Sequence, residues 1–148
     1  MTSLADLLTN DGKKAVVVDE CCVLIDEEVG DKSGLSGLAI KAGYGAIKGV
    51  SPGFVRSVVG DLLPKFAKAL DPLYQEAKQS GGQVGSYFTQ HRARVADALL
   101  AITDVQAERS RSGLVKGTYD RLRGSAKKNV EATVPRLGKL IERHTSNA

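Results

Sequence analysis

Two triplets of residues, each a tyrosine flanked by two cations, have the spacing of one helix face. Lys41, Tyr44 and Lys48 are separated by three and four residues, and residues at these spacings are neighbours on a helix surface. The same spacing recurs later in the chain, at Lys116, Tyr119 and Arg123. Two cations around a phenol can bind a phosphate or a carboxylate. The favoured alternative is structural: a half-buried tyrosine whose hydroxyl reaches solvent between the stems of basic side chains.

Further basic residues surround the second triplet. The densest basic run of the chain comprises Arg109, Arg111, Arg121, Arg123, Lys127 and Lys128. Arg121, Lys127 and Lys128 extend the candidate anion-binding surface, whose partner would be a nucleic acid or an acidic protein. Tyr119 is the one aromatic residue in this segment, whereas sites that bind single-stranded nucleic acid combine cations with several stacking rings. A solvated basic face is therefore the default interpretation.

The spacing of Tyr44 and Lys48 is also that of the tyrosine–lysine acid–base pair of some nicotinamide reductases. That chemistry needs a dinucleotide-binding sheet with a glycine-rich turn after a strand. Gly43 and Gly45 lack the third glycine of that turn and fall within a predicted helix. We therefore expect neither a catalytic residue nor a nucleotide cofactor from this motif.

The carboxylates and histidines do not follow a metal-binding pattern. Asp19 and Asp26 are seven residues apart, which is about 10 Å along a helix and too far for the two to share a small metal ion. Their expected role is to pair with basic segments or to stabilise helix starts. His91 and His144 stand alone, so no zinc site is predicted.

Cys21 and Cys22 are adjacent, and on a helix they point about 100° apart, so they cannot form an ordinary disulfide there. They belong to no Cys-x-x-Cys or Cys/His motif, and reduced thiols packed among small apolar side chains are the favoured interpretation. The start of the chain lacks the pattern of a signal peptide, and no apolar run reaches about 18 residues. These observations predict a cytoplasmic protein without a transmembrane segment.

Charge is distributed unevenly along the 148 residues, whose formal net charge is +4. Residues 1–38 carry −5, residues 39–108 carry +2 and residues 109–148 carry +7. An acidic start and a basic end can attract each other within one molecule or between two copies. Pairing within one molecule is favoured, and self-association stays open.

Apolar residues recur at helical spacing, and no stretch alternates long enough to predict a strand. The expected helices cover residues 4–8, 13–29, 35–50, 86–107, 114–122 and a last segment from 125. Ser51 and Pro52 are expected to begin another helix, which Pro64 and Pro72 bend or divide. Gly124 is expected to end one helix before Ser125 caps the last. The predicted fold class is all-α, a compact bundle of about six to eight helices.

The two halves of the chain resemble each other in five ordered blocks. The matched pairs are Lys14–Asp26 with Arg92–Asp104, Ser36–Leu38 with Ser112–Leu114, Ile40–Gly49 with Val115–Gly124, Val55 and Val59 with Val130 and Val134, and Pro64–Leu70 with Pro135–Ile141. We therefore predict an internal duplication within a single domain, 1–148. Halves of about 13–78 and 91–144, joined by a linker at about 79–86, would pack face to face as pseudo-symmetric three-helix units. Close approach of helices would explain Gly37, Gly43, Gly45 and Gly49.

The chain also resembles a family of small bacterial proteins of unknown function, found notably in actinobacteria. The resemblance covers most of the chain, and the segments that carry it are Asp31–Tyr44, Leu62–Phe66, Ala96–Asp104 and Gly124–Ala132. It implies a compact bacterial protein of the cytoplasm, and it brings no catalytic motif, cofactor or assigned activity.

The function expected from the sequence is therefore binding or assembly, through the basic C-terminal face and an anionic partner. The alternative is a small-molecule-binding protein or an enzyme with a pocket between the two halves. Tyr44, Tyr119 and carboxylates would line that pocket. An absence of catalytic motifs leans against an enzyme and leaves the question open.

Overall fold

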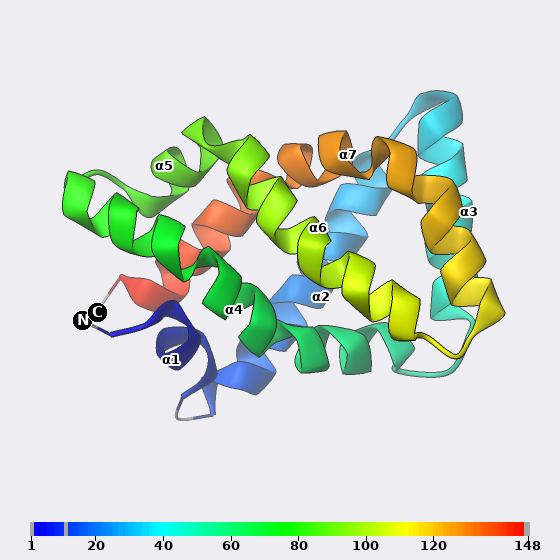
Figure 1. The fold of residues 1–148 in the computed structure, drawn as a ribbon, viewed down its shortest axis with the longest axis horizontal. Coiled ribbons are helices and arrows are strands. Elements are labelled where there is room, and N and C mark those ends of the chain that lie inside the picture. The colour runs from blue at the N-terminus through cyan, green and yellow to red at the C-terminus, as the bar shows by residue number, and fades with distance from the viewer. Residues whose placement is uncertain (1, 11, 147–148) are drawn as a thin grey trace.

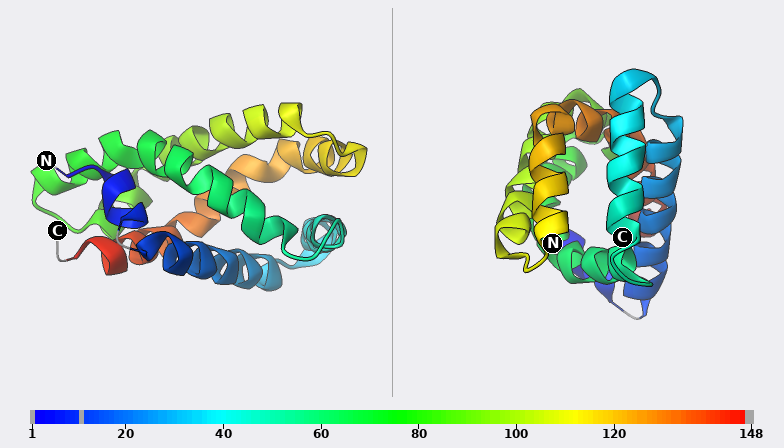
Figure 2. Two further views of the ribbon diagram at one scale, coloured as in Figure 1. Left: turned by 90° about the horizontal axis from the view of Figure 1, so that it is seen from below. Right: turned by 90° about the vertical axis from the view of Figure 1, so that its right-hand side faces the viewer.

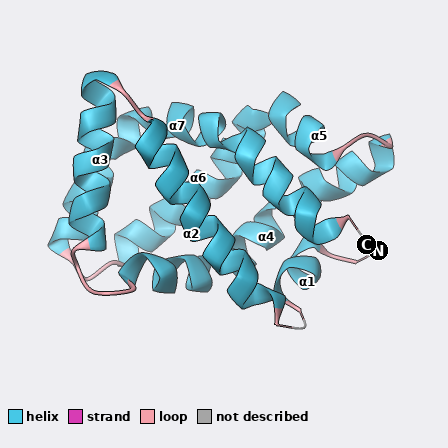
Figure 3. Cartoon of the chain, turned by 180° about the vertical axis from the view of Figure 1, so that it is seen from behind, coloured by secondary structure: helices cyan, strands magenta, loops and turns pink. Residues whose placement is uncertain are grey.

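The computed structural model describes residues 2–10 and 12–146, except the side chains of Leu35 and Ser36. These residues form seven helices and no strand (Figure 1, Figure 3). The helices are α1 (Leu4–Thr9), α2 (Lys13–Asp31), α3 (Gly34–Lys48), α4 (Phe54–Ser80), α5 (Val84–Gln90), α6 (Arg92–Arg109) and α7 (Gly113–Thr145). The all-α prediction is confirmed.

The main core includes residues of α1, of the start of α2 and of the last turns of α7, which lie at one end of the molecule (Figure 1). Helix α4 crosses this core, and between Leu62 and Ala77 its buried residues are leucines and alanines together with Tyr74. The other helices supply buried partners, among them Leu4, Leu8, Val17, Val84, Phe88, Val95, Val134, Leu140 and Ile141. Burying a side chain of this size stabilises the fold by about 1.5–3 kcal/mol. Helix α3 lies at the opposite end.

Helix α1 is short, and its position depends on α4. Ser3 caps it as the sequence predicts, because the Ser3 hydroxyl accepts a hydrogen bond from the Asp6 amide at 3.1 Å. The Leu4 amide donates to Asp71 of α4 at 2.8 Å, while Leu4 and Leu8 are buried. One polar contact and two apolar side chains therefore hold a six-residue helix that is too short to be stable alone.

Helix α7 runs without a break from Gly113 to Thr145, so the predicted helix end at Gly124 is wrong. Gly124 does not adopt the left-handed conformation of a C-terminal cap glycine. A glycine inside a helix costs about 1 kcal/mol relative to alanine, and the contacts of α7 with α3, α5 and α6 offset this. Pro135 is likewise accommodated inside the helix.

Helix α4 begins two residues after the predicted start. Gly53 (φ +73°) precedes the first helical residue, Phe54, so Ser51 and Pro52 belong to the preceding turn. Pro64 and Pro72 lie within one continuous helix instead of dividing it. The break that follows covers residues 81–83, and the segment expected as one helix over 86–107 forms α5 and α6, separated at His91.

Glycines mark two close helix crossings. Gly43 of α3 faces α7, where a Cβ added to it would lie 3.1 Å from Thr118 and 2.9 Å from Leu122. Gly85 of α5 meets Gly138 of α7, a crossing that the sequence did not suggest. The other three glycines near Gly43 serve no helix crossing: Gly37 faces the Lys32 backbone, Gly45 faces open space and Gly49 faces its own helix.

Candidate functional site

The first predicted triplet is anchored to α2. Tyr44 donates a hydrogen bond of 2.5 Å to Asp26, and Lys48 forms an ion pair of 3.6 Å with the same carboxylate. The Lys48 ammonium also lies 5.1 Å from the centre of the Tyr44 ring. Burial, followed by the bond to Asp26, raises the pKa of Tyr44. The phenol is therefore neutral, and its hydroxyl donates its hydrogen bond to a carboxylate of the same chain.

The second triplet has the same arrangement with α6 in place of α2. Tyr119 donates a short hydrogen bond to Asp104, and Arg123 forms a two-pronged ion pair with that carboxylate at 2.8 and 3.1 Å. Hydrogen bonds from Arg123 and Tyr119 hold the pKa of Asp104 below its usual range. Burial and the bond to Asp104 raise the pKa of Tyr119. Positions aligned in the two halves thus make equivalent contacts.

The remaining predicted cations differ in their surroundings. Lys127 pairs with Asp97 at 3.0 Å, and Arg121 donates to the Thr118 hydroxyl at 3.3 Å. Lys41, Lys116 and Lys128 are exposed, and within residues 2–10 and 12–146 no carboxylate lies within ion-pair distance of them. The nine candidates therefore do not converge on one anion site, because α3 and α7 present them to different carboxylates or to solvent.

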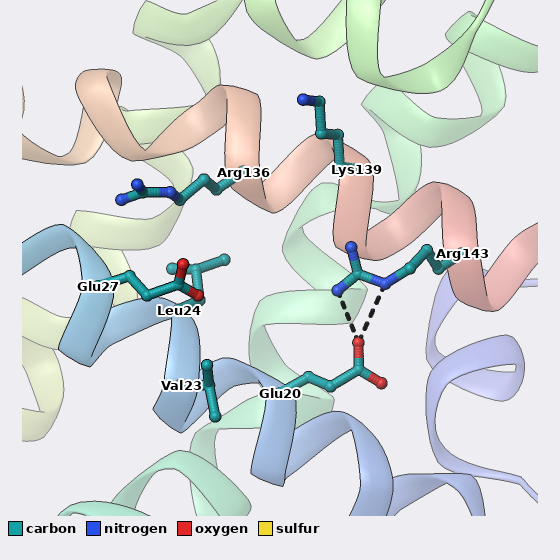
Figure 4. Close-up of a pocket in the computed structure, with 7 residues that line it drawn as sticks. All are labelled: Glu20, Val23, Leu24, Glu27, Arg136, Lys139 and Arg143. Carbon is teal, nitrogen blue, oxygen red and sulfur yellow. Dashed lines mark hydrogen bonds and ion pairs between the residues drawn. The ribbon is translucent and has the colours of Figure 1, made fainter.

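A groove between α2 and α7 shows where the acidic start and the basic end meet. Arg136, Lys139 and Arg143 of α7 line one side, and Glu20 and Glu27 of α2 line the other, around a hollow of about 340 Å³ (Figure 4). Arg143 donates twice to Glu20, at 2.6 and 3.2 Å. Arg136 reaches further carboxylates of α2, Glu28 at 3.0 Å and Asp31 at 2.5 Å.

His144 joins the same network. Its Nε2 lies 2.7 Å from Glu20, and its backbone carbonyl accepts a hydrogen bond of 2.9 Å from Lys13. Burial alone would raise the pKa of Glu20, but the bonds from Arg143 and His144 outweigh burial and lower it. Glu20, Glu28 and Asp31 of the acidic segment thus meet Arg136, Arg143 and His144 of the basic segment within one molecule.

An apolar cavity of about 490 Å³ lies at the end of the bundle occupied by α3. Figure 2 shows this end of the molecule, with α3 beside the first turns of α7 and the start of α4 close to α3. Residues of α2, α3, α4, α6 and α7 line the cavity, so both halves of the chain contribute. Its volume is within the range of about 300–1,000 Å³ that is usual for small-molecule sites.

Aromatic residues gather around this cavity. The chain has seven tyrosines and phenylalanines, and four of them line it: Tyr44, Phe54, Phe66 and Tyr119. Aliphatic side chains fill the spaces between the rings, and Thr103, Gln106, Ser57, Ser110 and Asp61 supply polar groups. Large rings with a few polar groups are typical of sites that bind small organic molecules.

The sequence identified Tyr44 and Tyr119 for a different reason and missed Phe54, Phe66 and Asp61. The one signal for these residues in the sequence was the scarcity of aromatic residues. Because the chain has so few rings, each ring outside the core is unusual. Their convergence depends on how α3, α4, α6 and α7 pack together, which a local pattern does not encode.

Over the described ranges, 2–10 and 12–146, histidine, cysteine and acidic side chains form no group of three that could hold a metal ion. In those ranges no helix combines the length and the apolarity that crossing a bilayer requires.

The model of a family described as "Family of unknown function (DUF6918)" matches residues 4–145. No curated protein and no solved structure matches the chain.

Proposed function

The chain belongs to the DUF6918 family, and we propose that it is a binding protein that holds a small apolar molecule in the cavity between its two halves. The observation that carries this proposal is the convergence of Tyr44, Phe54, Phe66 and Tyr119 on one cavity of about 490 Å³. The cavity mouth is open to solvent, so a ligand can enter without unfolding of a helix.

The energetics of the cavity support an occupant. Apolar surface in contact with water costs about 25 cal/mol per Å², so a molecule that displaces this water is favoured. Closer packing of α3, α4 and α7 would remove the cavity and would stabilise the fold. The rigid walls also favour binding: the hydroxyls of Tyr44 and Tyr119 are anchored to Asp26 and Asp104, which fixes both rings before a ligand arrives.

The basic C-terminal face is the weaker candidate for the binding function. Arg123 and Lys127 already pair with Asp104 and Asp97 of the same chain. An anionic partner would have to compete with these carboxylates for both side chains. Such competition reduces the number of counterions released on binding, and with it the affinity for nucleic acid.

Binding of an uncharged fluorophore tests the proposal. N-phenylnaphthylamine brightens in apolar surroundings, and we expect a saturable increase in its fluorescence together with a rise in Tm. A ligand present at about 100 times its Kd stabilises the folded state by about 2.7 kcal/mol. The proposal is wrong if neither signal changes with the unmodified protein.

A pair of variants on α6 locates the bound molecule. Ala107 lines the cavity, so Ala107→Phe fills part of it and should weaken fluorophore binding by about tenfold or more. Ala101 is exposed on the same helix and does not line the cavity, so Ala101→Phe should bind normally. Circular dichroism verifies that both variants are folded, and Ala107→Leu supplies a smaller filling group. Equal binding by all variants would place the fluorophore elsewhere.

A further inference from the structure

We propose that the cavity selects a cationic amphiphile, an apolar amine whose charged group lies beside Asp61. This inference rests on the proposed function and adds the chemical class of the ligand. It follows from the charge of the residues that line the cavity, from the hydrogen bonds that the two tyrosine hydroxyls already donate, and from the aromatic walls.

Among the described residues that line the cavity, the charged side chains have one sign. Asp61 of α4 supplies a carboxylate at the exposed rim. Among the described residues that line the cavity, none is lysine, arginine or histidine. No basic nitrogen of residues 2–10 or 12–146 lies within 4.0 Å of the Asp61 carboxylate. Asp61 is therefore free to pair with a cation from outside the chain, in a protein whose net charge is +4.

The strongest hydrogen-bond donors of the cavity wall are unavailable to an anionic group. Tyr44 donates to Asp26, and Tyr119 donates to Asp104. The Thr103 hydroxyl lies 2.8 Å from that of Tyr119 and 3.2 Å from the Leu100 carbonyl. Ser57, Gln106 and Ser110 leave only uncharged donors in the cavity wall, and a carboxylate or phosphate group there would lie near the Asp61 charge without a cation to pair with, which disfavours it.

The aromatic walls favour a cation independently of Asp61. The faces of aromatic rings carry negative potential and attract ammonium groups within about 6 Å. One ring of the cavity already attracts an ammonium group, since the Lys48 ammonium lies 5.1 Å from the centre of the Tyr44 ring. Rings together with a carboxylate at the rim form the combination that recognises alkylated ammonium groups.

Competition between matched amphiphiles tests the ligand class. Octylamine, n-octanol and octanoate share one alkyl chain and differ in charge at neutral pH. Each is titrated against the bound N-phenylnaphthylamine. We expect octylamine to displace the fluorophore at a concentration about tenfold lower than octanoate does, with n-octanol between them.

The Asp61→Asn variant tests the role of the carboxylate. It should bring the octylamine affinity close to that of n-octanol while the n-octanol affinity stays unchanged. Asp120→Asn makes the same change at an exposed carboxylate that does not line the cavity, and it should keep the preference for octylamine. Equal displacement by the three amphiphiles, or a preference for octanoate, overturns the ligand class and leaves the proposed function intact. Failure of the fluorophore and of all three amphiphiles to bind overturns both.

Discussion

Gly138 of α7 lies so close to Gly85 of α5 that a Cβ built on Gly138 would be 2.7 Å from the Gly85 Cα. The atom it would meet belongs to the backbone, which cannot move aside as the tip of a flexible side chain can. Glu142, one turn further along α7, accepts a hydrogen bond of 2.6 Å from the Gly85 amide and fixes the crossing. The position of α5 therefore depends on two residues without side chains.

The first prediction concerns this crossing. Gly138→Ala should lower the free energy of unfolding by about 1–3 kcal/mol, because the added methyl group forces α5 and α7 apart. Gly117→Ala is the matched control on the same helix, where a Cβ meets nothing within 4 Å. It should be neutral or stabilising by up to about 1 kcal/mol, through helix propensity alone. Urea denaturation measures both values, and equal effects would contradict the geometry.

The second prediction concerns the two anchored tyrosines. Burial and the bonds to Asp26 and Asp104 raise the pKa values of Tyr44 and Tyr119, so both should ionise at higher pH in the folded chain than in the unfolded chain. Because the folded-state pKa lies above the unfolded value of about 10, the associated stabilisation is complete below about pH 10. It is lost as the pH rises through the folded-state pKa.

Ultraviolet absorbance of tyrosinate, recorded with and without denaturant, measures this titration. Asp26→Asn removes the carboxylate beside Tyr44 and should lower the pKa of that phenol. Asp97→Asn removes a carboxylate that pairs with Lys127 instead of a tyrosine, and it serves as the control. An unchanged titration curve in Asp26→Asn would show that the hydrogen bond contributes nothing to the shift.

The third prediction concerns the adjacent thiols of α2. Burial, followed by the charges of Cys22 and Glu20, raises the pKa of Cys21 to about 11, and burial raises that of Cys22 as well. Thiolate is the reactive form, so alkylation by iodoacetamide at about pH 8 should be slower in the folded protein than in denaturant. Cys22→Ser and Cys21→Ser leave one thiol each, and mass spectrometry follows its labelling. Labelling of Cys21 at the denatured rate would contradict its burial.

The contacts of the two triplets support the duplication that we propose from the sequence. Asp26, Tyr44 and Lys48 are matched by Asp104, Tyr119 and Arg123, and both sets connect a tyrosine helix to a carboxylate helix. Asp19 and Asp97 are also aligned, and each forms an ion pair, with Arg56 and with Lys127 respectively, although these two cations are not aligned with each other. Gly43 and Thr118 are aligned positions that touch each other, as expected of residues near a two-fold axis.

The sequence by itself determined the helical class, most helix positions and the grouping of each tyrosine with its cations. These features repeat every three to four residues, so a short stretch of sequence is enough to predict them. The prediction from sequence failed where tertiary contacts outweighed a local signal. Gly124 and the prolines usually break helices, but tertiary contacts keep α7 and α4 continuous.

The tertiary structure decided which carboxylate each cation meets, which glycines approach one another and where a cavity remains. Asp61, Phe54 and Phe66 share a cavity with Tyr119 because α4 packs against α3 and α6, and both of these helices pack against α7. Such a meeting depends on crossing angles and on distances between segments far apart in the chain. The side-chain pattern of any one helix specifies its apolar face, and the shape of the space between helices arises only when those faces pack together.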